Sequence, residues 1–244
     1  MKVVIKREKP PFENLMTPTQ TVLGWIYVVL HVAVLPILVS LYAAFSPNPV
    51  GVAGSNLLYY GIGMLFVLCV MLRYLRRGFD ALLDNLRVCI LCVVVAMMIE
   101  YALSTVATLI LLLAEPLEEI DNPNNAAILD LAAENYGLIK GLTIFIAPIV
   151  EEVLFRGVVF GSIRKKSRGW AYVVSVAVFA IYHVWEYVVA EQDLSQLIYV
   201  VQYIPAAVAL AWAYERSGSI WTSIFFHMGF NALSFTVLNL MERL

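Results

Sequence analysis

Residues 148–157 have the sequence PIVEEVLFRG, which places two carboxylates and a guanidinium inside a run that otherwise has the composition of a membrane-spanning helix. A single charge at bilayer depth costs about 3 kcal/mol or more, so three together need partners or a function. On a helix, Glu152 and Arg156 lie four residues apart on one face, with the acid N-terminal to the base, which is the favoured order. Glu151 lies about 100° around the helix from Glu152 and faces elsewhere. The pattern predicts one acid held in an ion pair and a second acid available for chemistry.

The composition is that of an integral membrane protein. Of the 244 residues, 61% are hydrophobic and 14% are charged, and the mean hydropathy is +0.82. Soluble domains have about 45–50% apolar and about 25% charged residues. We therefore predict an all-α fold, a polytopic bundle of transmembrane helices, with the lipid bilayer as its surroundings and no nucleic-acid partner. Cys89 and Cys92 form a C-x-x-C pattern, which we interpret as two small apolar residues of a membrane helix.

Apolar runs of about 18 or more residues predict roughly seven spans. Their ranges are near 20–45, 55–72, 88–113, 137–163, 170–190, 194–214 and 218–240. Pro36 removes a backbone hydrogen bond in the first span and predicts a kink there. That span is too long for a signal-peptide core, so we expect a retained first helix. Aromatic residues near span ends, Tyr59 and Tyr60 among them, are expected to be interfacial anchors.

Basic residues predict the orientation. Lys and Arg occur before the first span, in 73–87, in 164–168 and at Arg216, whereas the alternate loops around 46–54, 114–136 and 190–193 contain none. The positive-inside rule therefore places the N-terminus in the cytoplasm and the C-terminus outside. Residues 73–87 mix bases, acids and leucines at helical spacing, which predicts a short interfacial helix on the cytoplasmic side. The acidic loop 114–136 is expected on the outer side, with a turn and a short helix.

Two histidines lie in later spans. Phe179 and His183 are one turn apart on one helical face, as are His227 and Asn231. Counted at about 1.5 Å per residue from the predicted cytoplasmic ends, Glu151 lies about 18 Å deep, His183 about 20 Å and His227 about 14 Å. Three polar groups from three helices are therefore expected in one layer of the bilayer.

These residue types suit the activation of water against a carbonyl group. A carboxyl group in an apolar setting is a competent general base. A neighbouring histidine can orient the water, and a second histidine together with an amide can stabilise an oxyanion. No serine or cysteine is paired with a base at a recognisable spacing, so covalent catalysis is less favoured. The pattern indicates acyl hydrolysis, most naturally of a peptide bond.

Three motifs also resemble a known family. Glu151-Glu152-x-x-x-Arg156, Phe179-x-x-x-His183 and His227-x-x-x-Asn231 are similar, in order and type, to the motifs of the CAAX protease and bacteriocin-processing (CPBP or Abi) family of intramembrane endopeptidases, which includes the Ras-converting CAAX endopeptidases. The resemblance covers about residues 137–240. It implies that Glu151 activates water with His183, that His227 and Asn231 form the oxyanion hole, and that Glu152, Arg156 and Phe179 support them.

The resemblance also implies a division of the chain and leaves the cofactor open. Residues 1–136 are expected to supply N-terminal membrane helices, the interfacial helix and the outer acidic loop, and 137–244 a catalytic four-helix core, all in one membrane domain. Such proteins have also been described as metallopeptidases, with Glu151, His183 and His227 as the matching zinc ligands. The chain has no H-E-x-x-H pair. We favour catalysis without a cofactor and keep zinc as the alternative.

The expected partner is a membrane-associated peptide or protein tail, of prenylated CAAX or leader-peptide type, delivered from the cytoplasm or from lipid. We expect a prokaryotic plasma membrane and a site nearer its cytoplasmic face. One rival is a proton-coupled transporter, which predicts inverted repeats that the sequence does not display. Another is a non-catalytic scaffold or immunity protein that keeps the fold, against which the intact set of motif residues argues.

Overall fold

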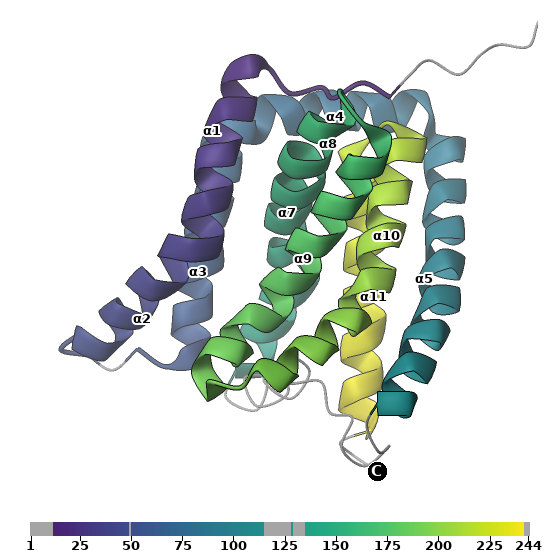
Figure 1. Cartoon of the computed structure of the whole chain (residues 1–244). Coiled ribbons are helices and arrows are strands. Elements are labelled where there is room, and N and C mark those ends of the chain that lie inside the picture. Colours follow the sequence, from purple (N-terminus) through teal and green to yellow (C-terminus); the bar gives the residue numbers. More distant parts are fainter. Residues whose placement is uncertain (1–11, 49, 115–127, 129–134, 242–244) are drawn as a thin grey trace, which may run out of the picture.

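The computed structural model describes residues 12–48, 50–114, 128 and 135–241, and no strand occurs in this part of the chain. Figure 1 shows a bundle of long helices, with the shorter helix α4 lying across one end. The predicted all-α class is confirmed. The predicted outer helix in 114–136 falls almost entirely outside the described residues.

Each predicted span has a helical counterpart. The segments are α1 (Pro18–Val29), η1 (Leu30–Val34) and α2 (Leu35–Phe45); α3 (Val52–Phe66), η2 (Val67–Met71) and α4 (Leu72–Asp84); α5 (Leu86–Ala114); η4 (Leu142–Ile146), α7 (Ala147–Glu151), η5 (Glu152–Phe160) and α8 (Gly161–Arg164); α9 (Arg168–Glu191); η6 (Leu194–Tyr199) and α10 (Val200–Ser217); and α11 (Ile220–Met241). Residues 135–141 are also helical.

Within the described residues, four helical stretches are long and apolar enough to cross a membrane: Pro18–Phe45, Val52–Asp84, Leu86–Leu113 and Leu194–Ser217. Many large apolar side chains on them are exposed, for example Ile37 and Leu113, as expected of helices that face lipid. The predicted spans 137–163, 170–190 and 218–240 are not among these four, and the first of them carries Glu151, Glu152 and Arg156. The count of seven spans and the cytoplasmic N-terminus remain predictions.

The first helical stretch bends where the sequence predicts a kink. Thr17 begins α1 with a capping box, in which its hydroxyl accepts from the backbone of Gln20 and the Gln20 side chain accepts in return. The π-helical turn η1 ends at Val34, and Pro36 is the second residue of α2, inside the continuous helical stretch Pro18–Phe45, where its missing N–H removes a backbone hydrogen bond. Figure 1 shows α2 inclined away from α1 at this point.

The predicted interfacial helix is α4, which forms as a direct continuation of η2. Figure 1 places α4, the start of α1 and α8 at the same end of the bundle, and the C-terminus at the opposite end. The basic residues of 73–87 and 164–168 therefore lie at one end of the bundle, as the orientation argument requires, whereas those of residues 2–9 lie outside the described residues.

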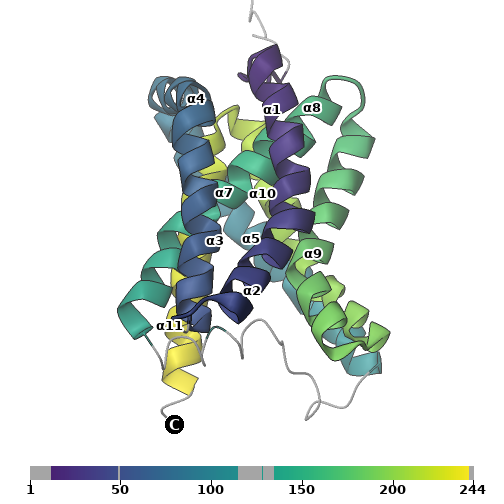
Figure 2. The same ribbon diagram turned by 90° about the vertical axis from the view of Figure 1, so that its left-hand side faces the viewer.

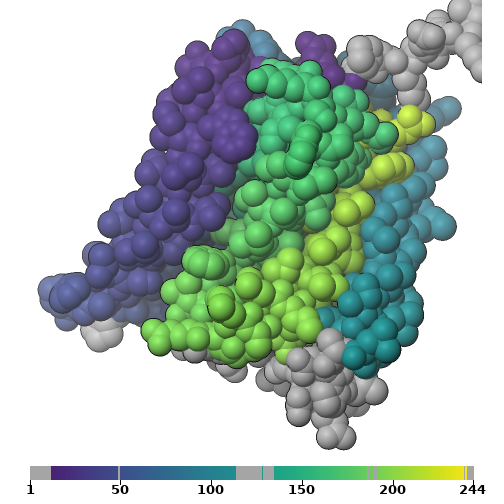
Figure 3. Space-filling model, viewed as in Figure 1, coloured from purple at the N-terminus to yellow at the C-terminus, as the bar shows by residue number. Residues whose placement is uncertain are grey.

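The π-helix η5 is the central element of the bundle. All nine of its residues are buried, and its apolar side chains belong to a core that includes Val28, Met71, Tyr74 and Tyr214 from other helices. Figure 2 shows the neighbouring helix α7 beside α3. In Figure 3, side chains of α1, α9 and α10 cover much of this central region from one side.

Glycines let the N-terminal segment approach this centre. The Asn14 amide donates to the Gly157 carbonyl over 3.0 Å, and a Cβ at Gly161 would lie 2.8 Å from the Asn14 Cγ atom. A methyl group at Gly157 would lie 2.6 Å from the Met16 side chain. Residues 14–16 therefore pack directly on the backbone of the helix that begins with Glu152.

We expect Gly161→Ala to destabilise the protein by about 1–3 kcal/mol, because the methyl group displaces Asn14 and breaks its hydrogen bond to Gly157. Gly169→Ala, in the first turn of α9, is the matched control, since a Cβ there meets nothing within 4 Å and should change stability by less than about 1 kcal/mol. Thermal unfolding in detergent micelles measures both. Equal melting temperatures for the two variants would contradict the proposed packing.

Candidate active site

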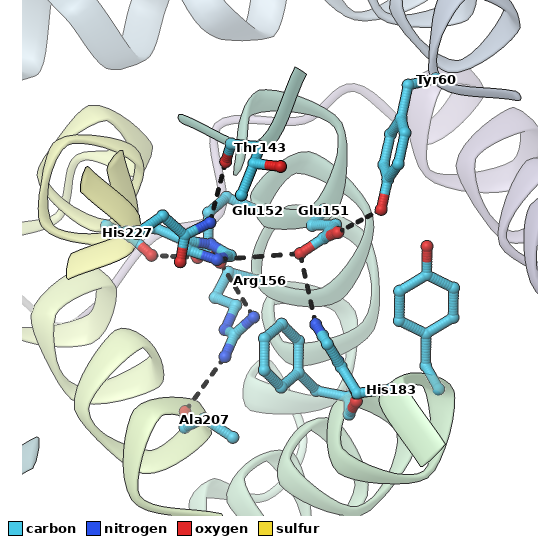
Figure 4. Close-up of polar contacts among 12 residues, drawn as sticks. Tyr60, Thr143, Glu151, Glu152, Arg156, His183, Ala207 and His227 are labelled. Carbon is cyan, nitrogen blue, oxygen red and sulfur yellow. Dashed lines mark hydrogen bonds and ion pairs between the residues drawn. The ribbon is translucent and has the colours of Figure 1, made fainter. Parts of the chain in front are cut away.

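Three helical stretches supply the predicted site residues. Glu151 ends α7 and Glu152 begins η5, His183 lies on α9, and His227 lies on α11. Pro148 is the second residue of α7 and follows directly on η4, so its missing N–H removes a backbone hydrogen bond inside this helical stretch. The predicted convergence of the three spans is confirmed, because Figure 4 shows both histidines directed at Glu151.

The Glu151 carboxylate is almost completely buried and uses its two oxygens differently. Oε2 lies 3.8 Å from Nε2 of His183 and 3.8 Å from Nε2 of His227. Oε1 accepts a hydrogen bond of 3.0 Å from the Tyr60 hydroxyl. One oxygen is therefore held by a donor on α3, while the other faces both imidazoles (Figure 4).

Both imidazoles are oriented through their Nδ1 atoms. Nδ1 of His183 lies 2.8 Å from the Phe179 carbonyl oxygen, and Nδ1 of His227 lies 3.0 Å from Oε1 of Glu152. A carbonyl oxygen only accepts, so His183 carries a hydrogen on Nδ1. In the neutral ring its Nε2 is then an acceptor, and it faces the Glu151 oxygen, which is another acceptor. Such a pair suits a donor such as a water molecule between them.

The second carboxylate, Glu152, is fully buried and surrounded by donors. Its Oε1 lies 2.9 Å from Nη1 of Arg156, and its Oε2 accepts a hydrogen bond from the Ser223 hydroxyl. Together with the His227 contact, these interactions link η5 to α11. The predicted intrahelical pair is thus confirmed, and it also connects helices that are distant in the sequence.

Arg156 makes two further contacts. Its Nη2 donates to the Ala207 carbonyl on α10 over 3.3 Å, and its guanidinium lies 4.1 Å from the centre of the Phe179 ring. Phe179 is buried and also contacts the His183 ring, with 4.3 Å between ring centres. Phe179 therefore separates the ion pair from His183 and touches both.

Asn231 lies one turn beyond His227 on α11. Its Nδ2 donates to the Thr143 carbonyl in η4 over 2.9 Å. One hydrogen of the amide is therefore engaged with the backbone, and this contact ties α11 to the helix that carries Glu151.

Two site residues were not predicted. Tyr60 was expected to be an interfacial anchor, and that prediction is wrong because its hydroxyl contacts Glu151. Ser223 lies four residues before His227 and thus on the same helical face. This spacing could have identified Ser223 from the sequence. For Tyr60 the sequence signal is weak, since tyrosines near span ends are commonly interfacial.

The segment that carries the candidate site is similar in sequence to known proteins. Residues 135–233 match the family model described as type II CAAX prenyl endopeptidase Rce1-like. The Bacillus subtilis (strain 168) protein named "Putative membrane peptidase YdiL" is 29% identical over 123 residues, which are 50% of this chain and 45% of that protein. No solved structure gave a significant match. Residues 135–233 are thus similar to the Rce1-like CAAX endopeptidase family.

All the motif residues lie within the Rce1-like segment, and the predicted resemblance is confirmed. Tyr60 lies outside it. The match to the Bacillus relative spans about half of each chain.

The metallopeptidase alternative can be tested against the geometry of the Rce1-like site. Ligand atoms of tetrahedral zinc lie about 3.3–3.6 Å apart, given metal–ligand bonds of about 2.0–2.2 Å. The Glu151 oxygen is 3.8 Å from each imidazole nitrogen, and among the described residues no three His, Cys, Asp or Glu side chains are grouped closely enough to hold a metal ion. These side chains are therefore spaced slightly more widely than zinc ligands, and zinc remains the alternative cofactor.

We expect Arg156→Met to lower stability by about 3–5 kcal/mol, because it leaves Glu152 as an unpaired buried charge. Adding Glu152→Gln should recover part of that loss. Arg168→Met is the control, since Arg168 pairs with Glu215 while being 63% exposed and should cost less than about 1 kcal/mol. Thermal unfolding in detergent measures all four proteins, and an Arg156→Met protein as stable as Arg168→Met would refute the role of the pair.

Proposed function

We propose that this protein is an intramembrane endopeptidase that hydrolyses a peptide bond of a membrane-associated substrate, with Glu151 as the general base. The observation that carries this proposal is the convergence of two imidazole Nε2 atoms on the same Glu151 oxygen, each at 3.8 Å. The Rce1-like match of residues 135–233 supports the same reaction class.

In the proposed reaction, water lies between Glu151 Oε2 and His183. Oε2 removes a proton, and the water oxygen forms a bond to the carbonyl carbon of the scissile peptide, whose electrons move onto the carbonyl oxygen. The carbon–nitrogen bond then breaks, and Glu151 returns the proton to the leaving nitrogen. The products are a carboxylic acid and an amine, and the Glu151 carboxylate is regenerated.

His227 and Asn231 are proposed to stabilise the oxyanion. His227 must carry a hydrogen on Nε2 to donate to it, and because its Nδ1 faces the Glu152 carboxylate at 3.0 Å, a fully protonated ring there would be balanced by that negative charge. Asn231 has two amide hydrogens, and the bond to Thr143 uses one. The second is the one we assign to the oxyanion.

The proposed substrate is a peptide or protein tail that reaches the site from the membrane, of prenylated CAAX or leader-peptide type. Glu151 is 3% exposed and His183 has a side-chain exposure of 15%, so the substrate must displace little water to reach the acid. We place the protein in a prokaryotic plasma membrane, with this site nearer the cytoplasmic face.

We expect Glu151→Gln to reduce kcat by at least about 100-fold, since it removes the base while keeping the shape of the side chain. The measurement is cleavage of a farnesylated CAAX peptide by detergent-purified protein, with thermal unfolding as the check on folding. Glu100→Gln is the control, because Glu100 is also buried in a helix but contacts Ser104. A folded Glu151→Gln protein with full activity would refute Glu151 as the base, whereas a natural protein that cleaves no such peptide would favour the scaffold or transporter alternative.

We expect activity to persist after stringent chelation, since Glu151 activates water without a metal in the proposed reaction. The experiment measures zinc content and peptide cleavage before and after treatment with a chelator. Activity that disappears with the metal and returns with added zinc would make Glu151, His183 and His227 ligands. The site would then stand and the proposed mechanism would be wrong.

A further inference from the structure

We propose that Tyr60 is a positioning residue, which fixes Glu151 through Oε1 so that Oε2 is the oxygen presented to both histidines. The inference rests on the proposed function of Glu151. It adds a residue from α3, which lies outside the Rce1-like segment, to the machinery of that site.

The contacts of Glu151 separate the tasks of its two oxygens. The Tyr60 hydroxyl donates to Oε1 over 3.0 Å, whereas Oε2 lies 3.8 Å from each imidazole. A glutamate has several rotatable side-chain bonds, and a single strong donor is enough to select one orientation of the carboxylate. With Tyr60 bound to Oε1, a turn of the carboxylate that carries Oε2 away from His183 and His227 breaks this hydrogen bond.

The packing of α3 against α7 holds Tyr60 in place. Gly63 lies one turn after Tyr60, and Val150 directly precedes Glu151. A Cβ at Gly63 would lie 2.8 Å from a methyl carbon of Val150, so only glycine allows the two helices to approach this closely. This close approach of α3 to α7 lies directly beside the hydrogen bond between Tyr60 and Glu151, which depends on it.

An aromatic cluster supports Tyr60 from the other side. The Tyr59 ring meets the Tyr60 ring edge to face, with 5.0 Å between centres, and the buried His31 ring stacks on Tyr59 at 4.3 Å. The Tyr59 hydroxyl donates to the His31 carbonyl over 3.0 Å. The Tyr60 ring is therefore fixed by packing, so Phe at this position should keep the ring in place and remove only the hydroxyl.

The test is the Tyr60→Phe variant, measured for kcat and KM on the farnesylated CAAX peptide. We expect kcat to fall at least about tenfold with KM changed less than about twofold, because the substrate still binds while the base is less often oriented. Tyr214→Phe is the matched control: it removes another buried tyrosine hydroxyl, one that is bonded to Tyr74 at 3.0 Å. This control should keep kcat.

A second pair of variants leaves the hydroxyl intact. Gly63→Ala should separate α3 from α7 and lower kcat in the same way as Tyr60→Phe, and adding Val150→Ala should restore it by making room for the new methyl group. A merely structural role predicts instead that the loss of activity follows the loss of melting temperature in each variant.

The outcomes distinguish this inference from the proposed function. If Glu151→Gln abolishes cleavage and folded Tyr60→Phe retains the full kcat, the role of Tyr60 is refuted and the function of Glu151 stands. An equal loss in Tyr60→Phe and Tyr214→Phe would also refute it. If cleavage does not depend on Glu151, the proposed function fails, and the role of Tyr60 fails with it.

Discussion

The fully buried ion pair of Glu152 and Arg156 is the interaction on which the rest of the structure depends. Removing two charges from water costs several kcal/mol per ion, and their attraction offsets this cost only when further hydrogen bonds complete both groups. The additional partners come from other helices: Ala207 on α10, and Ser223 and His227 on α11. Because the pair is stable only when α10 and α11 pack on η5, it specifies which helices meet at the centre of the bundle.

The change from α-helix to π-helix falls between the two acids of the motif. Glu151 ends α7 and Glu152 begins the nine-residue η5, and π-helical segments are rare and frequently found at functional sites. Each π-helical turn changes the angle at which later side chains leave the helix. The described part of the chain contains further π-helical segments in η1, η2 and η4, all in helices that adjoin the site. Beyond such a segment in the same helix, side-chain directions drawn on an ideal α-helix are therefore wrong.

Some parts of the site could be predicted from the sequence, and others could not. Glu151, His183 and His227 were predictable because charged and imidazole groups are rare in membrane helices and because simple rise per residue placed the three at similar depth. The Glu152–Arg156 pair was predictable because both residues lie on one helix. Tyr60 was not, since its partner is 91 residues away and the contact depends on how closely α3 approaches α7. The contact of Asn231 with Thr143 likewise depends on the rotation of α11 relative to η4.

The surroundings of the two adjacent carboxylates also indicate which one can exchange a proton. Glu152 contacts Arg156, Ser223 and His227, and protonating it would leave the Arg156 guanidinium as an unbalanced charge in a site with no exposure to water. Glu151 contacts one phenol and two imidazoles, so protonating it strands no permanent cation. A reaction that places a proton on one acid and then removes it is therefore cheaper at Glu151. The ion pair thus has two effects in the proposed enzyme: it fixes Glu152, and by doing so it leaves the role of base to its neighbour.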